Sequence, residues 1–327
     1  MNVQKILIIT NKYDVHADNV IPMLEERGAV VVRLNTEDLL SNYRIWWKPD
    51  GQGELRGSHH QLSFGDVDAV WYRKPNDYSL PPEWSGFDAF LREELRATMG
   101  GIYRSLATAR WINPLDAQRR ASYKLLQLQT AINVGLSIPD TLITNDPQQA
   151  REFAKVHGVS GIAAKTLGAG LVHLPRGQTI FTNRLCADQL EDAARMCCFP
   201  HFLQSYVEKE AELRVTVVGD RVFVCEMDTQ ASPNQGTRTD WRRYDFENVG
   251  YRPTELPVEI ESKLVGLMRR LGLIFGAIDM IRTPDGAHIF LEVNPAGQWL
   301  WVEQHTNLGI SDAISDLLVN GQLACVT

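Results

Sequence analysis

Two strand-like runs near the C-terminal end of the sequence constrain its fold more than any other feature. Residues 276–281 and 288–295 are rich in apolar side chains, and the Pro-Asp-Gly sequence at 284–286 between them is typical of a tight turn. With a two-residue turn at positions 285 and 286, counting outwards places Asp279 directly opposite Glu292. The sequence therefore predicts a β-hairpin that carries two carboxylates on one face.

Opposed carboxylates repel each other, so an otherwise apolar hairpin tolerates them only when a positive charge lies between them. Asp279 and Glu292, with the amide oxygen of Asn294 two residues further along the same face, form an oxygen-only set. Such a set suits Mg²⁺ shared with nucleotide phosphates. The alternative, surface carboxylates on an exposed strand, is disfavoured because we expect Leu291 and Val293 to bury the opposite face.

Two lysines and a small-residue loop suit a phosphate chain held against such a metal. Lys124 lies on a predicted helix, Lys165 ends a predicted strand, and Gly168 and Gly170 follow in a loop. A lysine is a compact donor to phosphate oxygens, and small residues let backbone N–H groups approach an anion. Either lysine alone would be interpreted as a solvated surface charge, so the prediction depends on their combination.

One arginine lies where it could act on a transferring phosphoryl group. Strand alternation over residues 213–217 places Arg214 on the same face as Glu212. Beside metal-bound carboxylates and phosphates, Arg214 would stabilise the charge that develops during transfer. The alternative interpretation is a plain surface ion pair between Arg214 and Glu212.

The first part of the chain predicts a β-α-β unit. Residues 5–10 form an apolar run, a helical stretch follows to Arg27, and a second strand covers 29–34. No G-x-G-x-x-G follows the first strand, which disfavours a dinucleotide site. A later strand at 69–72 ends in Arg73 and Lys74. Because ligands collect at the carboxyl ends of strands in open α/β sheets, this pair is a candidate peptide contact; a solvated pair before a turn is the alternative.

The rest of the chain predicts further packed units. Residues 42–64 suggest a hairpin, and a helix with core-facing apolar residues follows Ser85. Those apolar residues, all at helical spacing, are Phe87, Phe90, Leu91, Leu95, Met99, Ile102 and Leu106. Strands at 138–144 and 161–165 flank a helix capped by Asp146, and another helix covers 258–271. We expect boundaries that divide the chain into units 1–115, 116–199 and 200–327.

Composition excludes several classes of function. The formal net charge of −7 over 327 residues argues against a nucleic-acid partner, which requires a basic field. The cysteines are odd in number and lack C-x-x-C spacing, which disfavours a disulfide framework or zinc site. No apolar stretch approaches the length that spans a membrane. We expect a soluble, cytoplasmic protein that binds neither nucleic acid nor membrane.

In order and spacing, these features resemble the ATP-grasp superfamily, and within it the microviridin-type ribosomal peptide ligases, or graspetide synthetases. The resemblance runs nearly end to end. The sequences that carry it are VWYRK at 70–74, KLLQLQ at 124–129, GLSIP at 135–139, ELRVTVVG at 212–219 and GAIDMI at 276–281. It implies an α/β fold made of α+β lobes: an N-terminal β-α-β pre-ATP-grasp domain (1–115), a central ATP-grasp lobe (116–199) and a C-terminal lobe with the metal site (200–327).

The resemblance also implies a ligase that forms ADP and phosphorylates side-chain carboxylates of a precursor peptide bearing a leader. Lys amines or Ser/Thr hydroxyls would then displace phosphate and close macrocycles. ATP would lie between the central and C-terminal lobes, and Mg²⁺ on Asp279, Glu292 and Asn294. Arg214 and Lys165 would be catalytic. The nucleotide-binding residues would be Lys124, Lys165, Gly168, Gly170, Gln204, Ser205, Tyr206, Val207 and Glu212.

Two departures from the family pattern concern the phosphates and the peptide. The loop at 168–170 is poorer in glycine than in many ATP-grasp ligases, and Arg73-Lys74 stands where two arginines would be typical. A lysine is only a point charge, so Arg242 and Arg243 are predicted to supply a second basic element facing the substrate. Two other functions stay open: a ligase that adds a free amino acid to a protein tail or small acid, and a non-catalytic scaffold. A homodimer is the commonest homo-oligomer.

Overall fold

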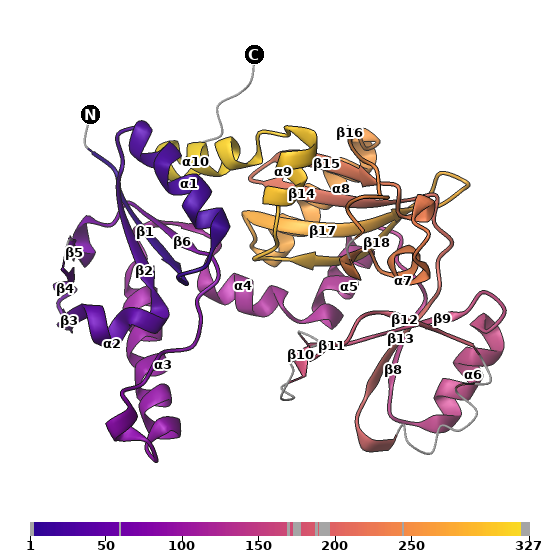
Figure 1. Cartoon of the computed structure of the whole chain (residues 1–327), viewed down its shortest axis with the longest axis horizontal. Helices are drawn as coiled ribbons and strands as arrows, with labels where there is room; N and C mark the ends of the chain where they lie inside the picture. Colours follow the sequence, from indigo (N-terminus) through magenta and orange to yellow (C-terminus); the bar gives the residue numbers. More distant parts are fainter. Residues whose placement is uncertain are drawn as a thin grey trace.

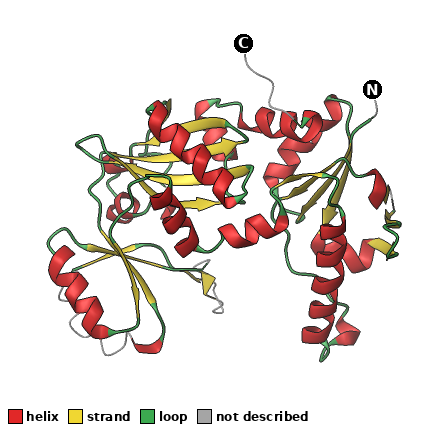
Figure 2. Cartoon of the chain, turned by 180° about the vertical axis from the view of Figure 1, so that it is seen from behind, coloured by secondary structure: helices red, strands yellow, loops and turns green. Residues whose placement is uncertain are grey.

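The computed structural model describes residues 3–58, 60–168, 171–172, 178–186, 189, 197–243 and 245–321. Its main sheets lie in three regions of the chain: an N-terminal sheet, a small central sheet and a larger C-terminal sheet (Figure 1). Seen from behind, the central sheet lies beneath the C-terminal one, and helices join this half to the N-terminal sheet (Figure 2). No helix of these residues is long and apolar enough to cross a membrane.

The N-terminal sheet is parallel and has the order β2-β1-β6-β7. Its strands are β1 (Lys5–Thr10), β2 (Val30–Asn35), β6 (Ala69–Tyr72) and β7 (Arg110–Ile112). Helix α1 (Val15–Glu26) connects the first two, which confirms the predicted β-α-β unit. The Asp14 side chain caps α1 by accepting from His16 N. Near the other end of the chain, α10 (Ile310–Asn320) packs beside α1, so the first and last elements share one core (Figure 1).

Two additions surround this sheet. Helix α2 (Leu39–Asn42) leads into a three-stranded antiparallel sheet of β3 (Tyr43–Trp47), β4 (Gly53–Gly57) and β5 (Gln61–Ser63). Helix α3 (Asp88–Ser105) buries Met99 and Ile102 as expected. The prediction was wrong for Phe87 and Phe90, which are 59% and 62% exposed. The start of α3 projects beyond the sheet (Figure 1), so the apolar residues at helical spacing there do not form a buried face.

Helices α4 (Leu115–Ala121) and α5 (Lys124–Asn133) connect the N-terminal sheet to the rest of the molecule. The chain turns at Ser122, so Lys124 is the first residue of its helix rather than an interior one. Gly135 follows α5 with a φ of +79°, a conformation that glycine adopts without strain, as expected of a helix stop.

The central sheet has the order β12-β9-β13-β8 and is antiparallel. Its strands are β8 (Thr141–Thr144), β9 (Ile162–Lys165), β12 (Asn183–Leu185) and β13 (His201–Ser205). Helix α6 (Pro147–His157), capped by Asp146 as predicted, packs Ala150 and Ala154 against it. A separate two-stranded ribbon joins β10 (Leu171–Val172) and β11 (Gln178–Thr179).

The C-terminal sheet is antiparallel in the order β16-β15-β14-β17-β18. Helix α8 (Val258–Leu271) packs on it through Leu264, Leu267, Met268 and Leu271. The short helices α7 (Gln235–Thr239) and α9 (Leu300–Thr306) lie at its ends. The strands are β14 (Ala211–Val218), β15 (Arg221–Met227), β16 (Tyr251–Thr254), β17 (Phe275–Arg282) and β18 (His288–Asn294).

The β17–β18 hairpin pairs Asp279 with Glu292, as predicted, but by a different route. Arg282 pairs with His288, so the connecting loop is longer than the expected two residues. A bulge next to Asp279 offsets the longer loop and restores the register. The bulge also turns Leu291 towards a pocket, so the expectation that Leu291 and Val293 bury the same opposite face was wrong for Leu291.

Candidate active site

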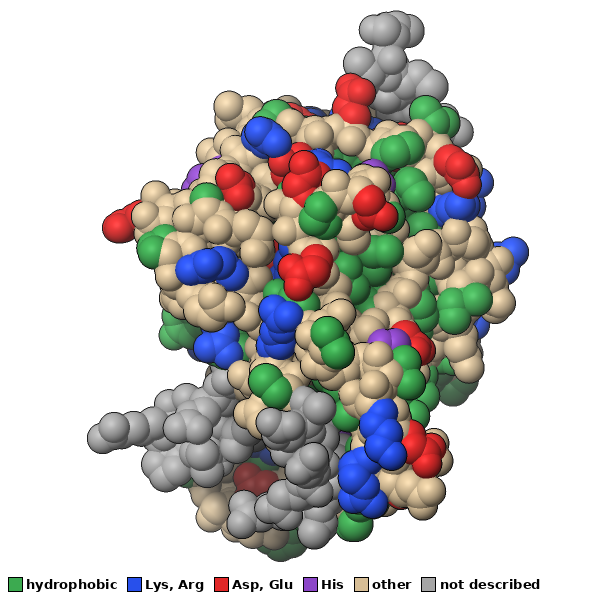
Figure 3. Space-filling view, turned by 90° about the vertical axis from the view of Figure 1, so that its right-hand side faces the viewer, with side chains coloured by type: hydrophobic (Ala, Val, Ile, Leu, Met, Phe, Trp, Pro, Cys, Tyr) green, Lys and Arg blue, Asp and Glu red, His purple; other side chains and the backbone are tan. Residues whose placement is uncertain are grey.

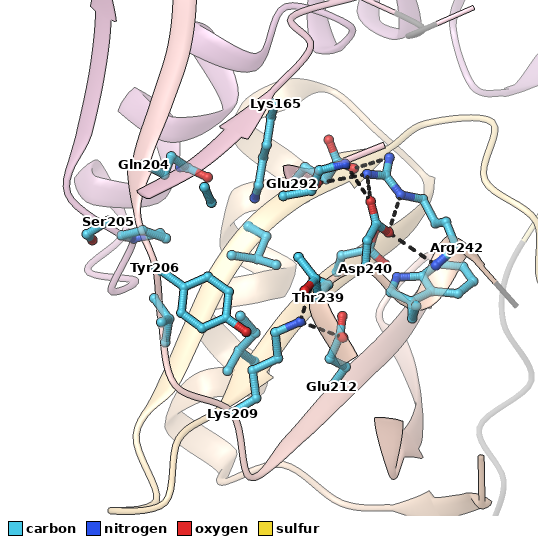
Figure 4. A pocket seen from close by; sticks show the side chains of 18 of the residues that line it. Lys165, Gln204, Ser205, Tyr206, Lys209, Glu212, Thr239, Asp240, Arg242 and Glu292 are labelled. Atoms are coloured by element: carbon cyan, nitrogen blue, oxygen red, sulfur yellow. Dashed lines mark hydrogen bonds and ion pairs between the residues drawn. The ribbon is translucent and has the colours of Figure 1, made fainter. Parts of the chain in front are cut away.

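A pocket of about 620 Å³ lies between the central sheet and the C-terminal sheet (Figure 4). Strands β9 and β13 supply one wall, and β14, β17 and β18 supply the other. On the molecular face in Figure 3, acidic and basic side chains are interspersed, as they are in the pocket. Charged side chains that line the pocket are Lys124, Lys165, Lys209, Glu212, Asp240, Arg242, Asp279 and Glu292.

Both predicted phosphate-binding lysines reach this pocket. Lys124 Nζ lies 2.7 Å from Glu292 Oε2, and Lys165 projects from the end of β9 towards the same space (Figure 4). Burial lowers the pKa of Lys165 to about 8, with Glu292 opposing the shift and Lys124 adding to it. A partly desolvated ammonium of this kind is well suited to bind an anion.

Arg214 faces the predicted metal ligand Asp279, and the alternative ion pair with Glu212 was wrong. Arg214 Nη1 donates to Asp279 Oδ1 at 2.7 Å, and Nη2 donates to the carbonyl of Gln298 at 3.0 Å. The guanidinium also lies 5.3 Å from the Trp241 ring centroid. Arg214 is thus held between a carboxylate, a carbonyl and an aromatic face.

Glu212 instead pairs with Lys209, a residue that was not among the predicted site residues. Their side chains are about equally buried, and Lys209 Nζ lies 2.7 Å from Glu212 Oε1. Lys209 Nζ also donates to the carbonyls of Arg238 and Thr239. Burial raises the pKa of Glu212, while Lys209 opposes that shift. This pair closes the pocket at the start of β14.

The two carboxylates of the hairpin are each held by cationic side chains. Burial raises the pKa of Asp279 although Arg214 opposes the shift. The pKa of Glu292 is lowered, because Lys124 and Arg242 outweigh the effect of burial. The positive charge that we expected between these acids therefore comes in part from protein side chains. One oxygen of each carboxylate, Asp279 Oδ2 and Glu292 Oε1, lies outside the close contacts with Arg214 and Lys124.

The two side chains of the predicted basic pair at 242–243 line different pockets. Arg242 lines the pocket, with Nη1 3.8 Å from Glu292 Oε1 and Nη2 2.6 Å from Asp240 Oδ2. Burial alone would lower the pKa of Arg242, but the bond to Asp240 raises it above its usual value. Arg243 turns away, donating to Asn183 Oδ1 at 3.3 Å and lining a different hollow. Only Arg242 therefore shares the pocket with the hairpin carboxylates.

The predicted nucleotide-binding segment at 204–207 lines the pocket with all four of its residues: Gln204, Ser205, Tyr206 and Val207. Gln204 is 1% exposed, and its Nε2 donates to Thr141 Oγ1 at 3.0 Å. Its Oε1 is buried without a hydrogen-bond partner among the described residues. A buried acceptor in a pocket wall suits a ligand that carries an amino group.

Other predicted residues lie elsewhere. Asn294 is exposed and is absent from the lining of this pocket; its Oδ1 accepts from Ala296 N at 3.0 Å. Gly168 is exposed, and Gly170 lies outside the described residues. Within the described ranges, no three His, Cys, Asp or Glu side chains cluster as a metal site. Of the three predicted metal ligands, the two hairpin carboxylates line this pocket.

Arg73 lies at the end of β6 and is buried, which excludes the alternative of a solvated pair. It is 1% exposed rather than solvated, whereas its neighbour Lys74 is exposed. Arg73 Nη1 donates to the carbonyl of Ala296, Nε lies 4.0 Å from Asp14 Oδ2, and the guanidinium lies 5.0 Å from the Trp299 ring centroid. Burial lowers the pKa of Arg73 to about 10. Arg73 thus supports the turn after β18.

Comparison with known proteins identifies the family. The family model described as "MvdD pre-ATP grasp domain" matches residues 5–119. A solved RiPP-associated ATP-grasp ligase of Chryseobacterium gregarium is 30% identical, with a TM-score of 0.89 and 98% of each chain covered. The macrocyclase MdnC of Microcystis aeruginosa is 31% identical, with a TM-score of 0.85, covering 97% of this chain and 100% of that one. The chain belongs to these ATP-grasp ligases.

The more distant relatives are named as α-L-glutamate ligases. A tetrahydromethanopterin:α-L-glutamate ligase of Methanocaldococcus jannaschii is 23% identical over 214 residues, covering 64% of this chain and 69% of that protein. A probable α-L-glutamate ligase of Parasynechococcus marenigrum is 24% identical, covering 84% of this chain and 58% of that one. The expected fold and family are confirmed, and the chain is an ATP-dependent carboxylate ligase.

Sequence reasoning missed several residues that line the ligase pocket. Lys209 and Asp240 come from loops whose path depends on contacts far along the chain; Asp240 Oδ2 accepts from Thr182 N at 2.9 Å. The only sequence signal for them is their position, since Lys209 lies just before the strand of Arg214 and Asp240 just before Arg242. Charged residues that are close in sequence to a predicted site residue can therefore belong to the same site.

Proposed function

We propose that the ligase uses ATP and Mg²⁺ to activate side-chain carboxylates of a ribosomal precursor peptide and to join them to Lys amines or Ser/Thr hydroxyls, forming macrocycles. The observation that carries this proposal is the gathering of Lys124, Lys165 and Arg242 around Asp279 and Glu292 in one pocket. Three cations beside two carboxylates suit a triphosphate with a shared divalent ion.

The pocket residues fit the nucleotide and the metal. Lys124 and Lys165 would contact phosphate oxygens, and the unpartnered Oε1 of Gln204 would accept from the adenine amino group. Asp279 and Glu292 would hold Mg²⁺ through Asp279 Oδ2 and Glu292 Oε1, the oxygens not in close contact with Arg214 or Lys124, and the bound ion would neutralise phosphate charge. Asn294 stays a proposed ligand; its amide oxygen keeps a second lone pair beside the bond from Ala296 N.

The reaction would proceed in two transfers. A peptide carboxylate oxygen attacks the γ-phosphorus of ATP, forming an acyl phosphate and releasing ADP. An amine or hydroxyl of the same peptide then attacks the acyl carbon, the bond to the phosphate oxygen breaks, and the nucleophile loses its proton. Arg214, held by Asp279 and Gln298, would stabilise the negative charge that develops on the oxygens. The protein itself needs no covalent nucleophile, only position and charge.

A peptide substrate is favoured by the solved relatives. The Chryseobacterium gregarium ligase is in complex with ADP and a leader and core peptide, and MdnC is bound with its precursor peptide MdnA. Both cover nearly all of this chain. We extend this to a leader-bearing precursor here, with Lys74 and Arg242 as proposed contacts. We retain the divisions near residues 115 and 199, a homodimer and a cytoplasmic location as further parts of the proposal.

Peptide-dependent ADP release tests the proposal directly. We expect ADP to form with ATP, Mg²⁺ and the precursor peptide encoded beside the gene, and each new bond to remove one water from the peptide in mass spectrometry. The second candidate, addition of free glutamate to an acceptor acid, is favoured by the α-L-glutamate ligases among the relatives. Turnover with free glutamate and no peptide would establish that alternative and reject the macrocyclase.

Glu292→Gln tests the metal assignment. The substitution keeps the side-chain shape and removes the charge, so we expect the fold to persist and Mg²⁺-dependent ATP cleavage to fall at least about 100-fold. Glu259→Gln is the matched control, since Glu259 is exposed on α8 and pairs only with Lys263 in a surface ion pair. Full activity of the Glu292 variant would refute the role of this carboxylate.

A further inference from the structure

A second pocket, of about 1230 Å³, lies beside the first, and apart from Asn294 its lining has no part in the chemistry above. Helices α3 and α4 form two of its sides, and the ends of β6 and β18 form the others. Asn294 lines it, two residues along β18 from Glu292 of the nucleotide pocket. At the spacing of a β-strand this is about 7 Å, so the two pockets adjoin.

The lining of this second pocket is basic. It includes Arg96, Arg104 and Arg119 but no Asp or Glu, although the whole chain has a formal charge of −7. Arg96 and Arg104 form ion pairs with exposed acids outside the lining, Asp77 and Asp116. Exposed pairs of this kind are weak and can be exchanged for an incoming carboxylate. Arg119 has no side-chain ion pair among the described residues.

Two buried polar atoms of the lining have no partner among the described residues: the hydroxyl of Tyr103 and Oε1 of Gln118. Tyr103 is 4% exposed, and its ring packs edge-on against Tyr72, which also lines the pocket. Burial raises the pKa of Tyr103 well above its usual value, so the hydroxyl stays protonated and can donate. An unpartnered donor and acceptor in one pocket wall suit a ligand that offers both a carboxylate and a backbone N–H.

We propose that this second pocket binds an acidic segment of the acceptor peptide and presents its carboxylates to the nucleotide pocket at Asn294. Arg96, Arg104 and Arg119 would pair with acidic side chains, and Tyr103 and Gln118 would bind one carboxylate and the peptide backbone. The inference rests on the proposed function, because a ligase needs its carboxylate beside the phosphates. A location next to Glu292 meets that requirement.

Fluorescence anisotropy with a defined probe tests this assignment without nucleotide. The probe is a short labelled peptide of alternating glutamate and threonine, and its counterpart has glutamine in place of glutamate. At low ionic strength we expect the full-length ligase to bind the glutamate peptide at least about tenfold more tightly than the glutamine peptide. Arg119→Ala and Arg96→Ala should each weaken binding about tenfold. Arg151→Ala, which removes an exposed arginine from α6, should leave it unchanged.

Tyr103→Phe separates binding from structure. A purely structural tyrosine with an unpartnered buried hydroxyl should tolerate Phe or become more stable. We expect an unchanged or higher midpoint of thermal unfolding together with weaker binding of the glutamate peptide. Equal binding of the two peptides by the wild type, or wild-type affinity in Arg119→Ala and Tyr103→Phe, would overturn the assignment.

The two proposals fail separately. Loss of the second pocket as a peptide site leaves ATP binding and ADP formation in place, which calorimetry with ATP and Mg²⁺ measures on the same preparations. Failure of the proposed function would instead appear as ADP formation that does not depend on the precursor peptide, as in turnover with free glutamate alone, while the anisotropy result for the glutamate peptide would stand.

Discussion

Arg214 and Asp279 face each other on adjacent strands, with Arg214 Nη1 2.7 Å from Asp279 Oδ1. The same guanidinium donates to the carbonyl of Gln298, in the turn that follows β18. From the N-terminal unit, Arg73 donates to the carbonyl of Ala296 in that turn. The turn is therefore held by two arginines from different parts of the chain, and one of them also contacts the proposed metal ligand.

Arg214→Lys should preserve the charge and lose the function. A lysine is a point charge and cannot span Asp279 and the Gln298 carbonyl at once, so the group aimed at the reacting oxygens loses its orientation. We expect peptide-dependent ADP release to fall about 100-fold, with nucleotide affinity little changed. Calorimetry and coupled ADP assays measure both. Arg269→Lys, in an exposed pair with Asp220, is the control, and an equal loss there would show a general effect of the substitution.

Lys165 should make nucleotide binding pH-dependent. Its pKa is lowered to about 8, so the ammonium that would contact phosphate is lost as pH rises through that value. We expect ATP affinity to fall between pH 8 and 9.5 in the wild type and to lose this slope in Lys165→Met. Lys155→Met, on the exposed face of α6, should keep the slope. An unchanged pH profile in Lys165→Met would remove Lys165 from the phosphate site.

The lowered pKa of Lys165 affects stability in the opposite direction to ATP affinity: stability rises with pH. The unfolded chain binds the Lys165 proton more tightly than the folded chain, since the pKa of lysine is 10.5 when unperturbed. Between about pH 8 and 10.5 the unfolded state therefore carries more protons at this residue, and its contribution to the free energy of unfolding rises with pH. Nucleotide-free wild type and Lys165→Met should differ in this interval in denaturant titrations.

The β17–β18 hairpin was predicted correctly in one respect and incorrectly in another. Asp279 and Glu292 were predicted to pair from the turn residues and alternation, because those signals are local. The prediction assumed too short a loop and no bulge, and the two errors cancelled in the register. A bulge depends on packing against neighbouring strands, which a count along one hairpin does not include.

Long-range contacts account for what local patterns missed. Arg73 was predicted as a peptide contact, with a solvated pair as the alternative, and the sequence gives no local sign that the turn at Ala296 and the ring of Trp299 cover it. These partners lie more than 200 residues away in the sequence. Phe87 and Phe90 were predicted to be buried but are exposed. Helical periodicity indicates that residues share a face and does not indicate whether a neighbouring element covers that face.

Asp14→Asn should weaken the junction between α1 and the turn after β18. Burial favours the neutral acid, but bonds with His16 and Thr10 and the charge of Arg73 lower the pKa of Asp14 to about 2. The shift from 3.8 corresponds to about 2 kcal/mol of stability, fully present above pH 4 and lost as pH falls towards 2. Urea unfolding at pH 7 should show this loss in the variant, with a smaller dependence on pH below 4.

The control for that measurement lies on the same helix. Asp18 is half-exposed and pairs with Arg33 at the surface, so Asp18→Asn should cost less than about 1 kcal/mol. A similar cost for the two substitutions would mean that the Asp14 network contributes no more than an exposed pair does.

Gly297→Ala tests whether the turn after β18 positions Arg214. A Cβ at Gly297 would lie 2.3 Å from the Cβ of Ala277 and 3.0 Å from Arg214 Nη2. Both neighbours are buried, so we expect a loss of about 1–3 kcal/mol in the free energy of unfolding and a loss of turnover as the guanidinium shifts. Gly65→Ala, where a Cβ meets nothing within 4 Å, should change neither quantity.

The double variant Gly297→Ala with Ala277→Gly distinguishes the two contacts. Removing the Cβ of Ala277 eliminates the closest approach, at the cost of about 0.5–1 kcal/mol for a glycine within a strand. Most of the stability should therefore return. Turnover should recover only if the remaining contact, with Arg214 Nη2, can relax without losing the bonds to Asp279 and Gln298. Stability restored without turnover would assign the role of this glycine to the orientation of Arg214, whereas a stability loss that persists would show that Ala277 is not the obstacle.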